Sequence, residues 1–312
     1  MKKEMKATSR VDQNSLLIPN RLRLKNLILW NLRGNLAVWA FDRFNLRKRW
    51  VLDRCWKNIK KRNQKECLVI AGGPSYTVEL AEALKQNCKG LEIIALNYYH
   101  LSQYKDDLIP SYYILSDPDT LSLDPETGRR LRSYIHKHSI TTCTPYGAKW
   151  VDESWETIVF NDSENVYSRN IDPRRARGYT SNTAFKAIAI ALELGYKRIF
   201  VVGLDHDYPR RISVTKDLRL TLTDAHHYKT LTEEPVIYPY FEGVAHALHC
   251  YALNFWHLRK LRSPRVVNVT DSSMVDVFER ISQRDFIEYL TKEARTLNQS
   301  VKDQNTDSTR NI

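Results

Sequence analysis

The sequence of 312 residues lacks an apolar run long enough to cross a membrane as a helix. Its best apolar segment, residues 27–44, is interrupted by Arg33, Asp42 and Arg43, whereas a spanning helix needs about 20 consecutive apolar residues. The N-terminus also lacks the pattern of a secretory signal, because its lysines lead into polar residues and no cleavage site follows. We therefore expect a cytoplasmic protein.

The sequence also lacks the cysteine spacings of a metal site or of a disulfide framework. Its five cysteines are Cys55, Cys67, Cys88, Cys143 and Cys250. An odd number of widely separated cysteines favours reduced thiols, as in the cytosol. No metal ligands are expected from them.

Acidic residues are scarce in the N-terminal segment. Residues 1–65 carry 18 Lys and Arg against four Asp and Glu, a net charge of +14, and the remainder of the chain carries −2. Trp30, Trp39, Trp50 and Trp56 lie among these basic residues. A basic, tryptophan-bearing amphipathic segment is typical of contact with an anionic membrane surface. A helical hairpin packed on the body is the alternative, and nucleic-acid binding is less favoured.

The rest of the chain has short apolar runs that alternate with helical patterns, and no internal repeat. Such alternation predicts an α/β fold, a Rossmann-like and mostly parallel sheet with helices on both faces. We expect a basic helical arm over 1–65, one α/β domain over 66–292 and a disordered tail over 293–312. The expected strands cover residues 67–71, 91–96, 112–115, 140–144, 157–160, 198–203 and 266–269, and the expected helices cover 77–86, 126–138 and 180–194.

Small and polar residues follow the expected strands. Because ligands of open parallel sheets bind beyond the carboxyl ends of the strands, these residues are the candidates for a site. The candidates are Gly72, Gly73, Pro74, Ser75, Asn97, Ser116, Asp117, Gly203, Asp205, His206, Asp207, Asn268 and Thr270.

Two stretches could bind a phosphate. Residues 72–75 form a glycine-rich turn before a helix, where backbone can approach an anion closely. The turn lacks the G-x-G-x-x-G pattern and the P-loop ending, so a plain tight turn is the alternative. Thr180, Ser181, Asn182 and Thr183 form a second helix start rich in hydroxyls, where anion binding and ordinary capping are both open.

Acid–base groups follow the strand at 198–203. Asp205 and Asp207 could hold a metal on a diphosphate, or Asp205 could bond a ribose or a backbone turn. Further on, His226 and His227 supply imidazoles, and one of them could take a proton from an acceptor hydroxyl near neutral pH. Adjacent histidines usually point in different directions, so at most one is expected to act.

Several of these segments together resemble a known group. Residues 70–75, Asn97, residues 179–183, residues 189–198 and residues 202–205 match in order the pattern of the domain of unknown function 115. That group includes 6-hydroxymethylpterin pyrophosphokinases and motility accessory factor glycosyltransferases, and it is related to the bacterial sialyltransferases of glycosyltransferase family 42. The resemblance covers residues 67–290 and leaves the basic arm unexplained.

The resemblance implies a Rossmann-like transferase that requires no metal. The glycine turn, the helix start at 180–182 and Asn97 would hold the donor nucleotide, together with Asp117, Gly203, Asn268 and Thr270. A histidine of the pair His226 and His227 would be the general base. The sequence departs from the sialyltransferase pattern at Gly72, Gly178 and Leu231.

From this resemblance we expect a nucleotide-sugar glycosyltransferase, with a CMP-sugar or another nucleotide-sugar as donor. Its acceptor would be a surface glycan or a lipid-linked glycan at the inner face of the cytoplasmic membrane, which the arm would contact. One alternative is a Mg²⁺-dependent ATP pyrophosphokinase acting on a pterin-like molecule. Another is a non-catalytic nucleotide- or nucleic-acid-binding module, whose salt-sensitive binding would depend on residues 1–65.

Overall fold

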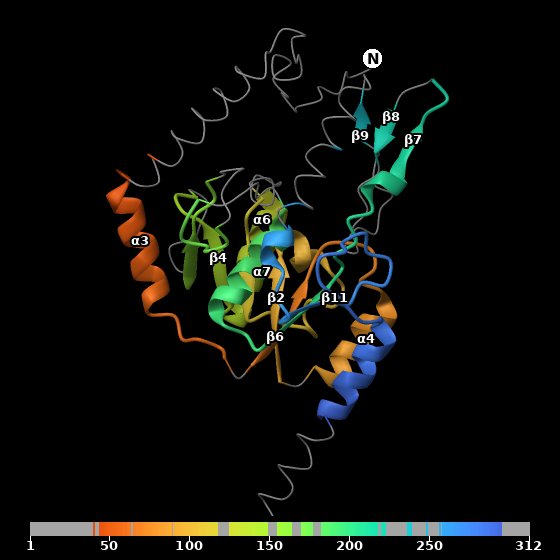
Figure 1. Cartoon of the computed structure of the whole chain (residues 1–312), viewed down its shortest axis with the longest axis horizontal. Helices are drawn as coiled ribbons and strands as arrows, with labels where there is room; N and C mark the ends of the chain where they lie inside the picture. Colours follow the sequence, from red (N-terminus) through yellow and green to blue (C-terminus); the bar gives the residue numbers. More distant parts are fainter. Residues whose placement is uncertain are drawn as a thin grey trace, which may run out of the picture.

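A computed structural model places most of the chain between residues 44 and 294 (Figure 1). It describes residues 40, 44–63, 65–88, 90–117, 125–148, 155–163, 170–176, 182–217, 220–222, 236–238, 248, 256 and 258–294. Most of the arm and nearly all of the tail expected from the sequence lie outside these residues.

An eight-stranded parallel sheet forms the centre of the molecule, in the strand order β11-β10-β6-β1-β2-β3-β4-β5. The Rossmann-like parallel sheet predicted from the sequence is thus confirmed. The strands are β1 (Glu66–Ile70), β2 (Leu91–Leu96), β3 (Tyr112–Ile114), β4 (Thr141–Pro145), β5 (Thr157–Phe160), β6 (Arg198–Val202), β10 (Val266–Asn268) and β11 (Glu279–Arg280).

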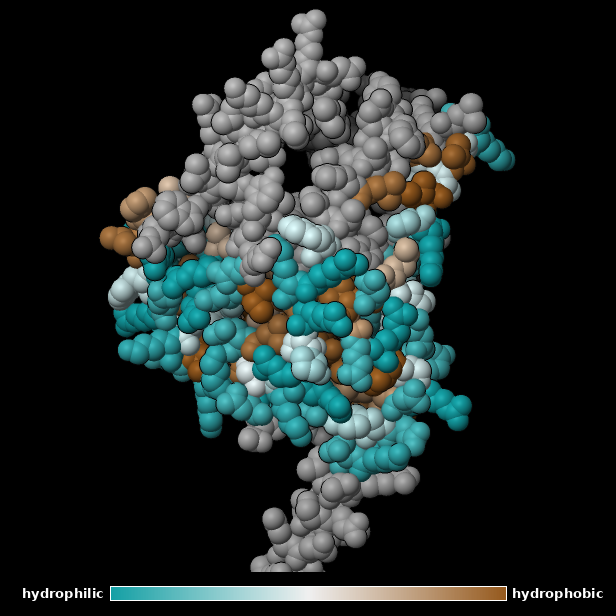
Figure 2. Space-filling model, in the orientation of Figure 1, coloured by the Kyte–Doolittle hydropathy of each residue, from teal (hydrophilic) through white to brown (hydrophobic). Residues whose placement is uncertain are grey.

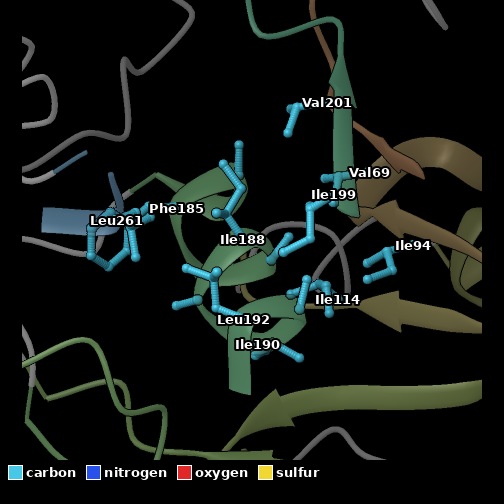
Figure 3. Close-up of a cluster of buried hydrophobic side chains, with 14 of the residues drawn as sticks. Val69, Ile94, Ile114, Phe185, Ile188, Ile190, Leu192, Ile199, Val201 and Leu261 are labelled. Carbon is cyan, nitrogen blue, oxygen red and sulfur yellow. The ribbon is translucent and has the colours of Figure 1, made fainter. Parts of the chain in front are cut away.

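Both faces of the sheet are covered by helices, because the central strands are apolar on both sides. Helix α7 (Thr183–Leu194) covers one face, where its side chain Ile188 shares a buried apolar cluster with Val69 and Ile199 (Figure 3). Three helices cover the other face: α4 (Val78–Asn87), α6 (Pro125–His138) and residues 283–294. The molecule therefore has three layers around two apolar cores.

The ends of α4 and α7 follow from their capping residues. Thr77 caps α4 by accepting a hydrogen bond from the Leu80 amide. Gly195 ends α7 with φ of 82°, as expected for a glycine stop. The cap of α7 is the Asn182 side chain, whereas Thr180 and Ser181, the caps expected from the sequence, lie outside the described residues.

Helix α3 (Leu46–Lys57) covers the free edge of β5, the last strand of the sheet. The Trp56 indole donates from Nε1 to the Val159 carbonyl at 2.8 Å, and the Val159 amide donates to the Cys55 sulfur at 3.5 Å. An exposed strand edge invites pairing with other chains, so this helix protects the sheet. The last part of the basic arm is therefore packed on the body.

A second, antiparallel sheet follows the end of β6, and the sequence patterns do not predict it. Its strands β7 (Ile212–Val214), β8 (Leu220–Leu222) and β9 (Val236–Tyr238) have three residues each, too few to show a clear period. The sheet projects from the body (Figure 1), and part of it is apolar in Figure 2. Three short 3₁₀ helices complete the described structure: η1 (Asn97–Leu101), η2 (Tyr208–Arg211) and η3 (Arg259–Leu261).

None of the helices within the described residues has the length and apolar character needed to span a membrane. The four cysteines of that part of the chain, Cys55, Cys67, Cys88 and Cys143, are free thiols.

The packing of α3 can be tested with two leucines of the same helix. Leu52 is fully buried and Leu46 is 72% exposed. We expect Leu52→Ala to lower the free energy of unfolding by about 3 kcal/mol, because it leaves a cavity between the helix and the sheet. Leu46→Ala is the control and should change it by less than about 0.5 kcal/mol. Equal effects in a urea titration would show that α3 is not seated on β5.

Candidate functional site

The loops at the carboxyl ends of the parallel strands form the candidate site. The glycine turn at 72–75 follows β1, Asn97 follows β2, and Ser116 and Asp117 follow β3. Residues 203–207 follow β6, which lies beside β1. Since all these strands are parallel, their ends meet at one rim of the sheet.

The glycine turn is closed by a carboxylate of the protein itself. The Ser75 hydroxyl and the Ser75 amide both donate to Asp205 Oδ2, at 2.8 and 3.3 Å. The Gly73 amide donates to the Gly203 carbonyl at 2.9 Å. A β-carbon at Gly73 would lie 1.9 Å from Asp205 Oδ2, so only glycine fits there. The carboxylate thus stands where the sequence alone suggests a phosphate.

Glycine is also required opposite this turn. Gly203 has φ of 69°, and a β-carbon on it would lie 2.7 Å from the Ala71 carbonyl oxygen. The Ala71 amide in turn donates to the Val202 carbonyl at 2.9 Å. The ends of the neighbouring parallel strands β1 and β6 therefore lie side by side in direct backbone contact.

The two carboxylates after β6 have different surroundings. Asp205 is 5% exposed, and burial raises the pKa of its carboxyl, while the hydrogen bonds from Ser75 lower it. Asp207 accepts two hydrogen bonds from the Arg211 guanidinium, at 2.9 and 2.7 Å. Both carboxylates are thus engaged within the protein. Among the described residues there is no cluster of three or more metal-ligating side chains.

The N-terminus of α7 is joined to the β6 loop through His206. Asn182 Oδ1 accepts from the amides of Ala184 and Phe185, at 2.8 and 3.3 Å, which fixes the orientation of its side-chain amide. Asn182 Nδ2 therefore donates to His206 Nε2, at 2.6 Å. The imidazole must then carry its proton on Nδ1. Burial lowers the pKa of His206 to about 4, so the ring is neutral at neutral pH.

A second set of contacts holds the other side of the α7 N-terminus. Asn97 Nδ2 donates to Thr183 Oγ1 at 3.0 Å, and its Oδ1 accepts from the amides of Ser116 and Asp117. The hydroxyls of Ser116 and Thr183 lie 2.9 Å apart. Asn97 and His206 both have positive φ, 37° and 47°. Such strained backbone is found most often at functional sites.

Asn268 and Thr270 lie behind this rim. Both are fully buried. Asn268 Nδ2 donates to Ser273 Oγ at 3.0 Å, and Thr270 Oγ1 accepts from the Leu204 amide at 3.1 Å. The Thr270 bond holds the loop after β10 against the loop after β6, whereas the Asn268 bond lies within the loop after β10. Contact with a nucleotide, expected from the resemblance, stays a prediction for these two residues.

The structure thus brings together the glycine turn, Asn97, Asp117, Asn182, Gly203 and Asp205. The predicted bases His226 and His227 and the predicted phosphate-binding residues Thr180 and Ser181 lie outside the described residues. The sequence marked His206 and Ser116 only as residues that follow a strand, and it marked Thr183 only as part of a helix start suited to anion binding. Their positions after a strand or at a helix start were the available sign, since hydrogen-bond partners distant in sequence leave no local pattern.

Comparison with known proteins adds one similarity. No protein-family model and no curated protein matches the sequence. Among solved structures, the chain is similar to the MAf glycosyltransferase from Magnetospirillum magneticum AMB-1, with a TM-score of 0.42 and 13% sequence identity. The similarity covers 80% of this chain and 42% of that chain, so this protein spans less than half of its length. At this level the likeness assigns neither a family nor an activity.

The role of Asp205 can be tested by two substitutions. Asp205→Ala leaves the Ser75 amide and hydroxyl without their acceptor, and we expect the free energy of unfolding to fall by about 1–3 kcal/mol. Asp205→Asn keeps an acceptor oxygen and should stay within about 1 kcal/mol of the unmodified protein. Asp276→Ala, at an exposed aspartate, is the control. An Asn variant that is stable but has lost nucleotide binding would contradict a purely supporting role.

The neutral state of His206 predicts a pH dependence of stability. Its folded pKa of about 4 lies below the ordinary value of 6.5, so below pH 6.5 the unfolded chain binds a proton that the folded chain does not. The stability that the neutral His206 ring contributes is present above the unfolded pKa and is lost as pH falls from 6.5 toward 4. Between about pH 7.5 and about pH 5, His206 alone should lower the free energy of unfolding by about 2 kcal/mol.

A variant isolates this contribution. Asn tolerates positive φ, so His206→Asn should fold. Over that pH interval its free energy of unfolding should fall by about 2 kcal/mol less than that of the unmodified protein. His100 has a pKa lowered to about 4 by burial, and it adds acid sensitivity in both proteins. His136→Asn, on the exposed side of α6, should behave like the unmodified protein. If the free energy of unfolding depends on pH in the same way in the His206 variant and in the unmodified protein, the buried neutral state of His206 is contradicted.

Proposed function

We propose that this protein is a nucleotide-sugar glycosyltransferase, with a CMP-sugar or another nucleotide-sugar as donor. Its acceptor would be a surface glycan or a lipid-linked glycan at the cytoplasmic face of the membrane. One observation supports the transferase most strongly. The glycine turn and the start of α7 are joined through neighbouring residues, Ser75 to Asp205 and His206 to Asn182. Two potential nucleotide-binding stretches thus share one rim of a parallel sheet.

The donor phosphate would lie at the start of α7 rather than in the glycine turn. In that turn the Asp205 carboxylate accepts from the Ser75 amide and hydroxyl, and its negative charge would repel an anion. The N-terminus of α7 offers the positive end of the helix dipole and the hydroxyls of Thr183 and Ser116. In this arrangement Gly72 and Asp117 would contact the nucleoside.

The reaction would proceed by direct displacement. A base takes the proton of the acceptor hydroxyl, whose oxygen forms a bond to the anomeric carbon. The bond from that carbon to the donor phosphate oxygen breaks, and the nucleotide leaves with the electron pair. A single displacement inverts the configuration at the anomeric carbon.

His206 does not fit the role of base. Its Nδ1 carries the proton and its Nε2 lone pair accepts from Asn182. Deprotonating an acceptor would require an imidazole with a lone pair available to the substrate. His226 and His227 remain the candidates, while His206 would position the start of α7.

Nucleotide binding provides the test of this function. We expect CMP or a CMP-sugar, at about 100 times its dissociation constant, to raise the melting temperature by at least about 5 °C. The increase should persist in EDTA. UDP-sugars and ATP with Mg²⁺ form the other arms of the panel. Stabilisation by ATP alone, abolished by EDTA, would instead indicate the pyrophosphokinase, and no stabilisation by any nucleotide would contradict the proposal.

A pair of threonine variants locates the binding site. Thr183→Val removes the hydroxyl at the start of α7 and should abolish most of the nucleotide-induced increase. Thr291→Val removes a hydroxyl that bonds within its own helix, to the Ile287 carbonyl, and serves as the control. Equal increases in both variants would place the nucleotide elsewhere.

A further inference from the structure

Helix α3 has an inner face whose contacts fix its orientation. Leu52 and Trp56 are buried, and the Trp56 indole bonds the edge strand β5. Lys48 is also buried, and its Nζ donates to Asn161 Oδ1 at 2.7 Å and to Ser163 Oγ at 2.8 Å. These three residues follow one another at intervals of four, so they line one side of the helix. The opposite side must therefore face away from the body.

This outer face combines large apolar and basic side chains. Leu46 is 72% exposed and Trp50 is 60% exposed, and Phe44 just before the helix is 73% exposed. The remaining residues of this face, Arg47, Arg54 and Lys57, are exposed as well. Large apolar side chains exposed next to one another usually mark a binding surface.

The charges of α3 are distributed unequally. Its single acidic residue, Asp53, lies at the margin of the outer face and accepts a hydrogen bond from the Arg175 guanidinium at 3.0 Å. The outer face itself is purely basic and apolar. The Arg54 guanidinium lies 5.0 Å from the Trp50 ring, so the cation and the indole are presented together.

This combination fits the boundary region of a membrane. Tryptophan and leucine side chains partition between the headgroups and the acyl chains, while arginine and lysine bind lipid phosphates. A nucleic acid would use the cations but would leave Phe44 and Leu46 in contact with water. An apolar protein surface would leave the cations without partners. An anionic lipid surface would contact both the basic and the apolar side chains.

We propose that Phe44 and the outer face of α3 bind the surface of a membrane that contains anionic lipid. This outer lipid-binding face comprises Phe44, Leu46, Arg47, Trp50, Arg54 and Lys57. The helix would lie in the plane of the headgroups while its inner face stays on β5. The inference rests on the membrane part of the proposed function and assigns that contact to particular residues.

Binding to lipid vesicles tests this assignment in the full-length protein. Vesicles of phosphatidylcholine with phosphatidylglycerol should sediment the protein, and vesicles of phosphatidylcholine alone should not. Each basic residue near an anionic surface contributes about fivefold. Combining R47Q, R54Q and K57Q should therefore weaken binding about 100-fold. Removing three cations from α6, with R129Q, R132Q and K137Q, is the matched control and should leave binding within about threefold.

A second measurement reports the position of Trp50. Brominated lipids should quench the tryptophan fluorescence of the bound protein, and Trp50→Phe should reduce that quenching while vesicle binding is retained. All these substitutions are at exposed positions, and circular dichroism confirms the fold of each variant.

The outcomes separate this inference from the proposed function. Unchanged binding of the α3 variant, binding to neutral vesicles alone, or binding to an oligonucleotide but not to vesicles would overturn the lipid-binding face. Each of these results leaves the nucleotide-induced stabilisation intact if the rim binds a donor. Conversely, lipid binding without any nucleotide-induced stabilisation would contradict the proposed transferase function and support the outer lipid-binding face.

Discussion

The carboxylate of Asp205 organises the rim of the sheet. It is buried and it accepts both hydrogen bonds that Ser75 donates, so it ties the end of β6 to the turn after β1. That contact is possible only because Gly73 has no side chain and Gly203 adopts a positive φ. Burying a carboxylate is unfavourable unless hydrogen bonds compensate for the lost hydration, and here the turn supplies them. Gly73 and Gly203 are therefore needed to accommodate the Asp205 carboxylate of the protein itself.

This arrangement changes which group can bind an external anion. With the turn occupied, the first turn of α7 still presents the positive end of a helix dipole at the rim. That turn is held on one side by Asn97, which follows β2, and on the other by His206, which follows β6. The strand between them is β1, so the two holding residues are on either side of the glycine turn. Both have strained backbone, which packing on the sheet stabilises.

Seven of the eight strands of the sheet and the helices α4, α6 and α7 were predictable from the sequence, whereas the contacts of the site were not. Short, mainly apolar runs bounded by turns are typical of strands, so β2 and β5 were predicted with the bounds that the structure gives them. The strand ends then placed the candidate residues on one rim. The bond from Ser75 to Asp205 joins residues 130 positions apart, and no local pattern encodes it. For the same reason a phosphate site and a carboxylate-filled turn look alike in the sequence.

The N-terminal arm is a second region whose contacts the sequence pattern did not determine. Its composition left packing on the body and binding to a membrane as alternatives, because a sequence does not say which side of a helix is covered. The structure shows that α3 has a packed side and an exposed side, so the two alternatives are not exclusive for this helix. Its inner residues close the edge of the sheet, which any use of the fold requires. Its outer residues are not needed for that purpose, and solubility alone does not explain an exposed tryptophan beside an exposed leucine. A surface that stability does not require, and that combines apolar and basic groups, supports the proposal of a lipid partner.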